Sequence, residues 1–167
     1  MSIAQTMLPE YDHEMANTRK YIEHAPEGHN DWKPHGKSMS LGELISHMVE
    51  LPAWLQSTMS ETELDMAPVG GEPYKTQQLD SKEAMLEAFD RGVAAGREAL
   101  AGASDQDLMV EWTLKSGGHT IMSMPRVAVY RSFVMNHLFH HRGQLGVYYR
   151  LLDAPVPAIY GPSADES

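Results

Sequence analysis

The chain has 167 residues, no cysteine and a formal net charge of −10. This length predicts one domain, residues 1–167, that can bury a large core without disulfide or metal support. The missing cysteines exclude disulfides, thiolate ligands and a cysteine nucleophile. The acidic balance, with no run of Lys and Arg to offset it, argues against a nucleic-acid partner.

The first residues show no charged-then-apolar signal pattern, and the chain has no run of about 18 apolar residues that could span a bilayer. We therefore expect a cytoplasmic protein with no membrane partner.

The first expected helix covers about residues 3–25, and two near matches to metal motifs within it are rejected. His13-Glu-Met-Ala-Asn17 begins like the zinc-protease motif His-Glu-x-x-His but has asparagine at the second ligand position. Glu10-Tyr-Asp-His13 has the Glu-x-x-His spacing of a di-iron bundle, but the last long helix offers no second copy.

The second expected helix begins at Ser40, where Glu43 completes a capping box. One face of it reads Ser40, Leu44, His47, Leu51, Trp54, so that His47 interrupts an apolar stripe. Glu43 and Glu50 lie one turn either side of His47. Each could orient its imidazole by accepting a hydrogen bond, or could simply be solvated at the surface.

Residues 61–78 contain two prolines and two glycines and predict a long irregular connection, which either covers a site or only spans the bundle. The third helix starts near Asp80. Its inward face is made mainly of small residues, which allow close helix packing or leave room for a substrate: Met85, Ala88, Gly92, Ala95 and Ala99. Apolar and polar residues then alternate in two segments, 109–115 and 119–124, which are separated by Ser-Gly-Gly. This pattern predicts a small β-hairpin.

The last expected helix covers residues 125–153 and carries imidazoles in the middle of an apolar seam. His137 and His141 are four residues apart, so both rings can point to one spot, as two ligands of one metal ion must. His140 lies off this seam. A lone His-x-x-x-His pair is more often a structural feature, and a third ligand is needed; His47 on the second helix could supply it.

Three segments resemble the DinB/YfiT-like metalloenzyme family: Ser40-Leu-Gly-Glu-Leu-Ile-Ser-His47, Asn136-His-Leu-Phe-His-His-Arg-Gly-Gln144, and Pro157-Ala-Ile-Tyr-Gly-Pro-Ser-Ala-Asp-Glu166. The resemblance implies a four-helix bundle, usually dimeric, with His47, His137 and His141 on one divalent metal ion. We therefore predict an all-α fold, a DinB/YfiT-like four-helix bundle with a small β-hairpin before the last long helix. Composition alone predicts a disordered tail at 153–167, whereas the resemblance implies that it docks.

Three neutral imidazoles would leave a zinc, nickel or iron(II) ion with open coordination positions, an arrangement typical of catalytic sites. Such an ion could activate water or a soft thiol. The resemblance favours a low-molecular-weight thiol as cosubstrate and an S-transferase-like enzyme with a small-molecule substrate. The alternative is a non-catalytic, metal-binding, dimeric module linked to stress.

Several neighbouring side chains have two possible roles. Gln144 could hydrogen-bond a ligand or substrate, and three aromatic residues could line a pocket or pack in the core: Trp54, Tyr130 and Tyr148. Arg142 points away from the seam, which favours a salt bridge or a subunit contact.

Overall fold

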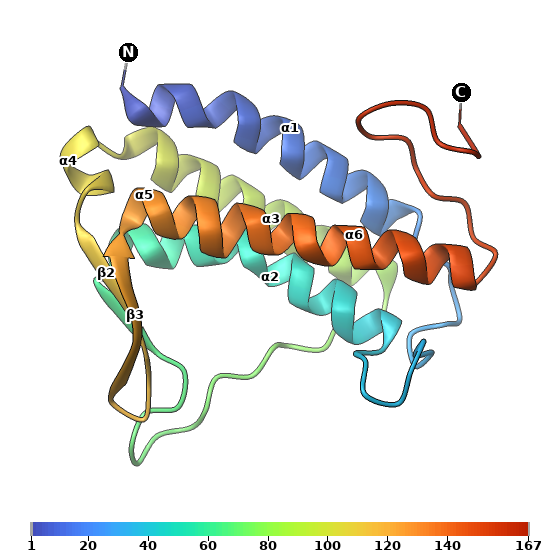
Figure 1. Ribbon diagram of the computed structural model, residues 1–167, viewed down its shortest axis with the longest axis horizontal. Coiled ribbons are helices and arrows are strands. Elements are labelled where there is room, and N and C mark those ends of the chain that lie inside the picture. Colours follow the sequence, from blue (N-terminus) through green and yellow to red (C-terminus); the bar gives the residue numbers. More distant parts are fainter. Residues whose placement is uncertain (1, 167) are drawn as a thin grey trace.

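The computed structural model describes residues 2–166, most of them in four long helical segments that lie side by side (Figure 1). The segments are α1 (Ile3–Glu23), α2 (Leu41–Ser60), α3 (Lys82–Gly102) and a continuous stretch of α5 (Arg126–Val129), η1 (Tyr130–Met135) and α6 (Asn136–Leu151). A short helix, α4 (Asp105–Leu108), precedes the strands β2 (Glu111–Ser116) and β3 (His119–Pro125), and β1 (Glu63–Asp65) follows α2.

Serine side chains fix the starts of the helices. Ser2 and Ser40 both form capping boxes, with Gln5 and Glu43 respectively, as expected for Ser40. At α3 the N-cap is Ser81, one residue after the expected Asp80. Each serine hydroxyl accepts a hydrogen bond from a backbone N–H that has no partner within its helix.

A small three-stranded sheet lies at one end of the helices, in the order β1-β2-β3 (Figure 1). Strands β2 and β3 occupy the two segments where alternation predicted strands, and they pair antiparallel. Strand β1 pairs parallel to β2 and corrects the prediction of an all-α fold with two strands only. With three residues, β1 is too short to show a period, and the oxygens of Asp65 hold it against the turn by accepting from the N–H groups of Gly117 and Gly118.

The small face of α3 allows close packing against α2. A Cβ atom added at Gly96 would lie 2.6 Å from the carbonyl oxygen of Pro52 and 2.6 Å from the hydroxyl oxygen of Tyr11. Pro52 lies within α2, which continues to Ser60. Helices α2 and α3 therefore lie so close together at position 96 that only glycine, which has no Cβ, fits there.

The last long segment contains a π-helical turn, η1, which the sequence pattern did not predict. A π turn spreads more residues over each turn and so rotates the side chains before it relative to those after it. Of the two roles considered for Tyr130, the structure shows core packing: its ring lies against Tyr11 of α1, with ring centroids 6.5 Å apart. Phe133 takes the place next to His137, with ring centroids 5.7 Å apart.

The tail after α6 docks along α1 and α6, as the resemblance implied and contrary to what composition predicted (Figure 1). The ammonium group of Lys20 donates to the carbonyl oxygen of Ala158 and to the carboxylate of Glu166. Arg150 forms an ion pair with Asp165 at 2.6 Å. The last residue of the tail, 167, lies outside the described residues.

The described helices include none that combines the length and the apolar character needed to cross a membrane.

Candidate metal centre

The structure brings the three predicted histidines together. His47 comes from α2, and His137 and His141 come from α6, one helical turn apart. One ring nitrogen from each lies within 4.8 Å of the others. The Nε2 atoms of His47 and His137 are 3.2 Å apart, close to the roughly 3.3 Å expected between two nitrogens bound tetrahedrally to one zinc ion.

Hydrogen bonds fix the orientation of two of the rings. The Nδ1 atom of His47 lies 2.9 Å from a carboxylate oxygen of Glu50, and Nδ1 of His141 lies 2.9 Å from the amide oxygen of Gln144. Because these oxygens accept hydrogen bonds, each Nδ1 carries the proton in the neutral ring and each Nε2 keeps a free lone pair. That tautomer is the one a metal ion requires at Nε2.

The third ring, that of His137, is uncharged at neutral pH. Burial, followed by the nearby rings of His141 and His47, lowers its pKa from 6.5 to about 4. Burial also lowers the pKa of His141. Neutral imidazoles are the form that binds metal, so the set of three nitrogen donors fits a divalent ion.

Glu50 links this centre to the connection between β1 and α3. One carboxylate oxygen accepts from His47 and from the hydroxyl of Thr76 at 2.7 Å, and the other accepts from the hydroxyl of Tyr74 at 2.8 Å. Burial raises the pKa of Glu50, but the hydrogen bonds from His47, Thr76 and Tyr74 outweigh it and lower the pKa overall. Glu50 is therefore an anion that holds both the imidazole and the connection.

Tyr74 and Thr76 were missed by sequence reasoning, although the connection itself was considered as a cover for the site. Nothing in their local sequence distinguishes them, because no helical or strand period includes them. The indole N–H of Trp54 donates to the Tyr74 hydroxyl at 3.0 Å, so the connection is also attached to α2. The roles of Tyr74 and Thr76 depend on contacts with residues far away in the chain. The only sequence signal for them was the length of the connection in which they lie.

Two of the other predicted residues lie beside the centre, and Glu43 does not. The Trp54 ring lies 6.4 Å from the rings of both His47 and His137. Gln144 hydrogen-bonds His141, which is itself one of the three candidate metal ligands. Glu43 caps α2 and pairs with Lys33 at 3.1 Å, so of its two possible roles the structure shows the one at the surface.

The remaining candidates stabilise the packing of the helices. The hydroxyl of Tyr148 donates to the carbonyl oxygen of Met39, and Tyr130 is fully buried in the core. Arg142 forms the expected salt bridge, a buried ion pair with Glu14 at 2.7 Å on the side of α6 away from the centre. His140 is exposed and lies outside the histidine cluster.

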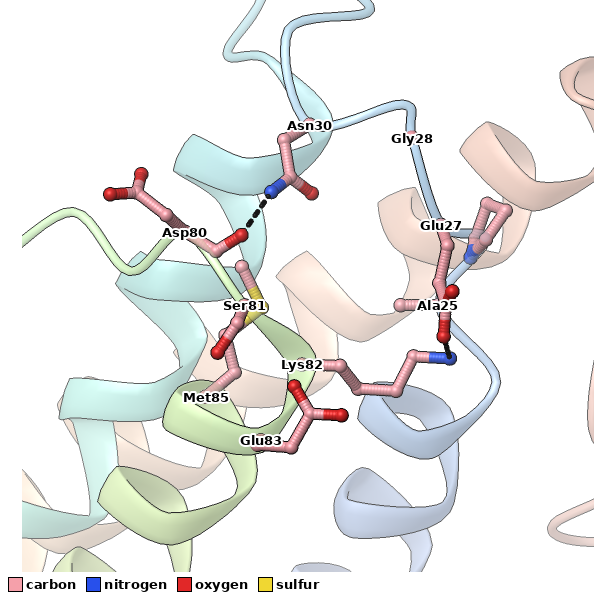
Figure 2. A pocket seen from close by; sticks show the side chains of 10 residues that line it. Ala25, Glu27, Gly28, Asn30, Asp80, Ser81, Lys82, Glu83 and Met85 are labelled. Atoms are coloured by element: carbon pink, nitrogen blue, oxygen red, sulfur yellow. Dashed lines mark hydrogen bonds and ion pairs between the residues drawn. The ribbon is translucent and has the colours of Figure 1, made fainter.

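The histidine cluster is distinct from a polar cavity of about 260 Å³ between the α1–α2 connection and the start of α3 (Figure 2). That cavity has no histidine among its lining residues, and two of its polar contacts join lining residues to one another. The amide of Asn30 donates to the carbonyl oxygen of Asp80 at 2.9 Å, and Lys82 lies 3.5 Å from Glu27. These pairings leave no donor set for a metal ion comparable with the three imidazoles.

Comparison with known proteins agrees with this geometry. The model of the DinB family matches residues 1–167. The chain belongs to the DinB family. No curated protein matches it.

Two crystal structures of DinB-like proteins share the fold. One, from Bacillus cereus ATCC 10987, has a TM-score of 0.71 and 21% sequence identity, and the match covers 95% of this chain and 98% of that one. The other, from Bacillus subtilis, has a TM-score of 0.69 and 18% identity, with 93% and 97% covered. The chain therefore has a DinB-like fold that is mostly helical, with one small sheet.

Proposed function

We propose that this DinB family protein is a metal-dependent enzyme that activates a small nucleophile at the three-histidine centre. The observation that carries the proposal is the donor set. Within residues 2–166, the cluster consists of His47, His137 and His141, with no carboxylate among them. Three neutral ligands leave the charge of a divalent ion uncompensated and its remaining coordination positions open, whereas structural zinc sites have four protein ligands.

The metal proposed is zinc, nickel or iron(II), since all three accept imidazole ligands. When bound, such an ion acts as a Lewis acid that makes a thiol or a water nucleophilic near neutral pH. Glu50 and Gln144 hold the imidazoles of His47 and His141 in orientation, while the rings of Trp54 and Phe133 pack beside that of His137. These residues prepare the site before any substrate binds.

A low-molecular-weight thiol is the cosubstrate we propose: its thiolate sulfur forms a bond to an electrophilic carbon of a small molecule, and the leaving group on that carbon departs with the electrons of the bond that breaks. The chain has no cysteine, so a thiol must come from outside it. A soft thiolate is a good ligand for all three candidate metals. Hydrolysis by an activated water is the second reaction that the same charge arrangement supports. As in the family it resembles, we propose a four-helix bundle that assembles as a homodimer.

Elemental analysis of untagged protein tests the metal centre, because a histidine tag can itself introduce nickel. We expect about one equivalent of a divalent metal per chain. His141→Ala should lose it, and His119→Ala, which removes an exposed histidine from β3, should keep it. Wild-type protein with no stoichiometric metal, even after incubation with zinc, nickel and iron(II) salts, would overturn the proposal.

Activity is tested next with metal-loaded protein, a low-molecular-weight thiol and an alkylating electrophile. We expect the wild type and His119→Ala to consume the thiol, and His141→Ala to show only the uncatalysed rate. A protein that binds metal but turns over neither thiols nor esters would instead be the non-catalytic binding module. Light scattering then shows whether it is a dimer.

A further inference from the structure

An aromatic cavity of about 230 Å³ lies next to the metal centre, between α2, the sheet and η1. Four aromatic rings line it: Trp54, Tyr74, Trp112 and Phe133. They come from α2, from the connection after β1, from β2 and from η1, so that the tertiary fold alone assembles the cavity.

Two of these rings are shared with the metal centre. Trp54 and Phe133 stack on each other, with centroids 5.4 Å apart and planes 18° apart. The Phe133 ring lies 5.7 Å from that of His137, and the Trp54 ring lies 6.4 Å from that of His47. The shared rings therefore lie about two helical turns along α2 from His47 and about one turn along the last long helical segment from His137.

Three polar side chains in the cavity wall are hydrogen-bonded, whereas the buried indole N–H of Trp112 has no partner among the described residues. Glu50 and Tyr74 hydrogen-bond to each other at 2.8 Å, and the hydroxyl of Thr58 donates to the carbonyl oxygen of Trp54. The carboxylate oxygens of Glu50 already accept hydrogen bonds from His47, Tyr74 and Thr76. What remains is mainly apolar and aromatic surface, which favours a neutral apolar group.

The volume limits the size of this group. An apolar cavity of about 150 Å³ holds one benzene molecule, so 230 Å³ accommodates a single aromatic ring with a small substituent. Stacked or edge-on contacts with the four lining rings would add to the favourable burial of such a ring.

We propose that this aromatic cavity binds a neutral, single-ring aromatic part of the substrate while the reacting group of the same substrate lies at the three-histidine centre. Placement of the reacting group rests on the function proposed above, whereas occupation of the cavity by a ring does not. The substrate class that follows is an uncharged benzyl- or phenyl-bearing electrophile.

Hydroxamates test the link to the metal centre, because every member of the series chelates a metal through the same two oxygens. Binding to zinc-loaded protein is measured by calorimetry for acetohydroxamate and for phenyl hydroxamates with zero, one or two methylene groups before the ring. We expect at least one phenyl compound to bind 10-fold or more tighter than acetohydroxamate, the scale expected for burying several more carbons.

Ser57→Phe fills the cavity from an exposed position of α2, and Leu64→Trp fills it from β1 as a second variant. Both should abolish the preference for phenyl and leave acetohydroxamate binding unchanged. Gln56→Phe, a neighbouring exposed residue that does not line the cavity, is the matched control and should keep the preference. Circular dichroism verifies that each variant is folded.

Metal-free protein separates this proposal from the proposed function. Binding of 4-fluorotoluene, followed by fluorine NMR, should be seen with the wild type and Gln56→Phe and lost in Ser57→Phe. If fluorotoluene binds but no hydroxamate does, the cavity is a site for an aromatic ring and the metal-dependent function is overturned. If hydroxamates bind without a phenyl preference and fluorotoluene does not bind, the aromatic cavity is not a ligand site.

Discussion

Glu50 couples the histidine cluster to the connection that passes beside it. Its carboxylate accepts hydrogen bonds from His47, Tyr74 and Thr76. A carboxylate in this position orients a ligand imidazole and raises its basicity, and its loss typically lowers metal affinity by 10- to 100-fold. We predict a loss of about that size for Glu50→Gln, measured by competition with a chromophoric chelator.

The control for this prediction is Glu43→Gln. Glu43 lies on the same helix and carries the same charge, but it pairs with Ser40 and Lys33 and contacts no imidazole. Metal affinity should therefore not change in this variant. An equal loss in both variants would mean that overall charge, and not the hydrogen bond to His47, sets the affinity.

The half-buried ring of His137 makes the stability of the metal-free protein depend on pH. Its pKa is about 4 in the folded state against 6.5 for an unperturbed ring. Between these values the unfolded chain binds the extra proton, so folded-state stability falls as the pH drops from 6.5 to 4. After allowance for solvent screening of a half-buried ring, the loss is about 1–2 kcal/mol.

His137→Gln should remove this part of the pH dependence, because glutamine does not titrate. Urea unfolding in the presence of EDTA, near pH 4.5 and near pH 7, measures it. His119→Gln removes an exposed histidine instead and should behave as the wild type does. If the free energy of unfolding changed by the same amount between pH 7 and pH 4.5 in all three proteins, the assignment of this pH dependence to His137 would be contradicted.

At the scale of elements, the contact between α2 and α3 depends on Gly96. An added Cβ would collide with the carbonyl oxygen of Pro52 and with the hydroxyl of Tyr11 at 2.6 Å each. The backbone oxygen cannot move away without displacing α2. We predict that Gly96→Ala lowers the free energy of unfolding by about 1–3 kcal/mol, measured by chemical denaturation.

Gly102→Ala is the matched control for this prediction. It lies at the end of α3 with nothing within 4 Å of an added Cβ. Because alanine favours the helix over glycine, this variant should be as stable as the wild type or slightly more stable. A similar loss at both positions would rule out the close contact as the cause.

At the scale of the whole molecule, Arg142 connects α6, α1 and the tail. Its guanidinium pairs with Glu14, donates to Thr18 at 3.1 Å and also contacts the hydroxyl of Tyr160. The Tyr160 hydroxyl in turn donates to Glu14 at 2.6 Å. Both charged side chains are buried, so each depends on the other for compensation.

We predict that Arg142→Met lowers the free energy of unfolding by about 3–5 kcal/mol, because it leaves the Glu14 carboxylate buried without a counter-charge. It should also make the tail more sensitive to limited proteolysis. Adding Glu14→Met should restore most of the stability. Arg150→Met breaks the exposed pair with Asp165 on the same helix and should cost less than about 1 kcal/mol.

Much of the fold follows from local sequence. The helical period indicates α1, α2 and α3, the Ser40 capping box marks where α2 begins, and alternation locates β2 and β3. The three histidines could be predicted because His47 interrupts an apolar stripe and because His137 and His141 share a face four residues apart. These signals depend on neighbours within one or two turns, which the sequence contains directly.

Other features could not be obtained in this way. Strand β1 is too short to show a period. The π-helical turn η1 has no distinct sequence pattern, so the sequence did not indicate that Phe133 lies beside His137. Tyr74 and Thr76 lie in an irregular connection. Each of these depends on contacts between segments far apart in the chain, which local sequence does not specify.

The sequence by itself determined which residues supply the imidazoles, because helical spacing decides which side chains can face one point. Only the tertiary structure decided that Glu50, Tyr74 and Thr76 form hydrogen bonds beside the three-histidine cluster and that four aromatic rings enclose a cavity next to it. The physical reason is that hydrogen-bond partners and cavity walls come from different elements, and their meeting is set by how the helices and the sheet pack.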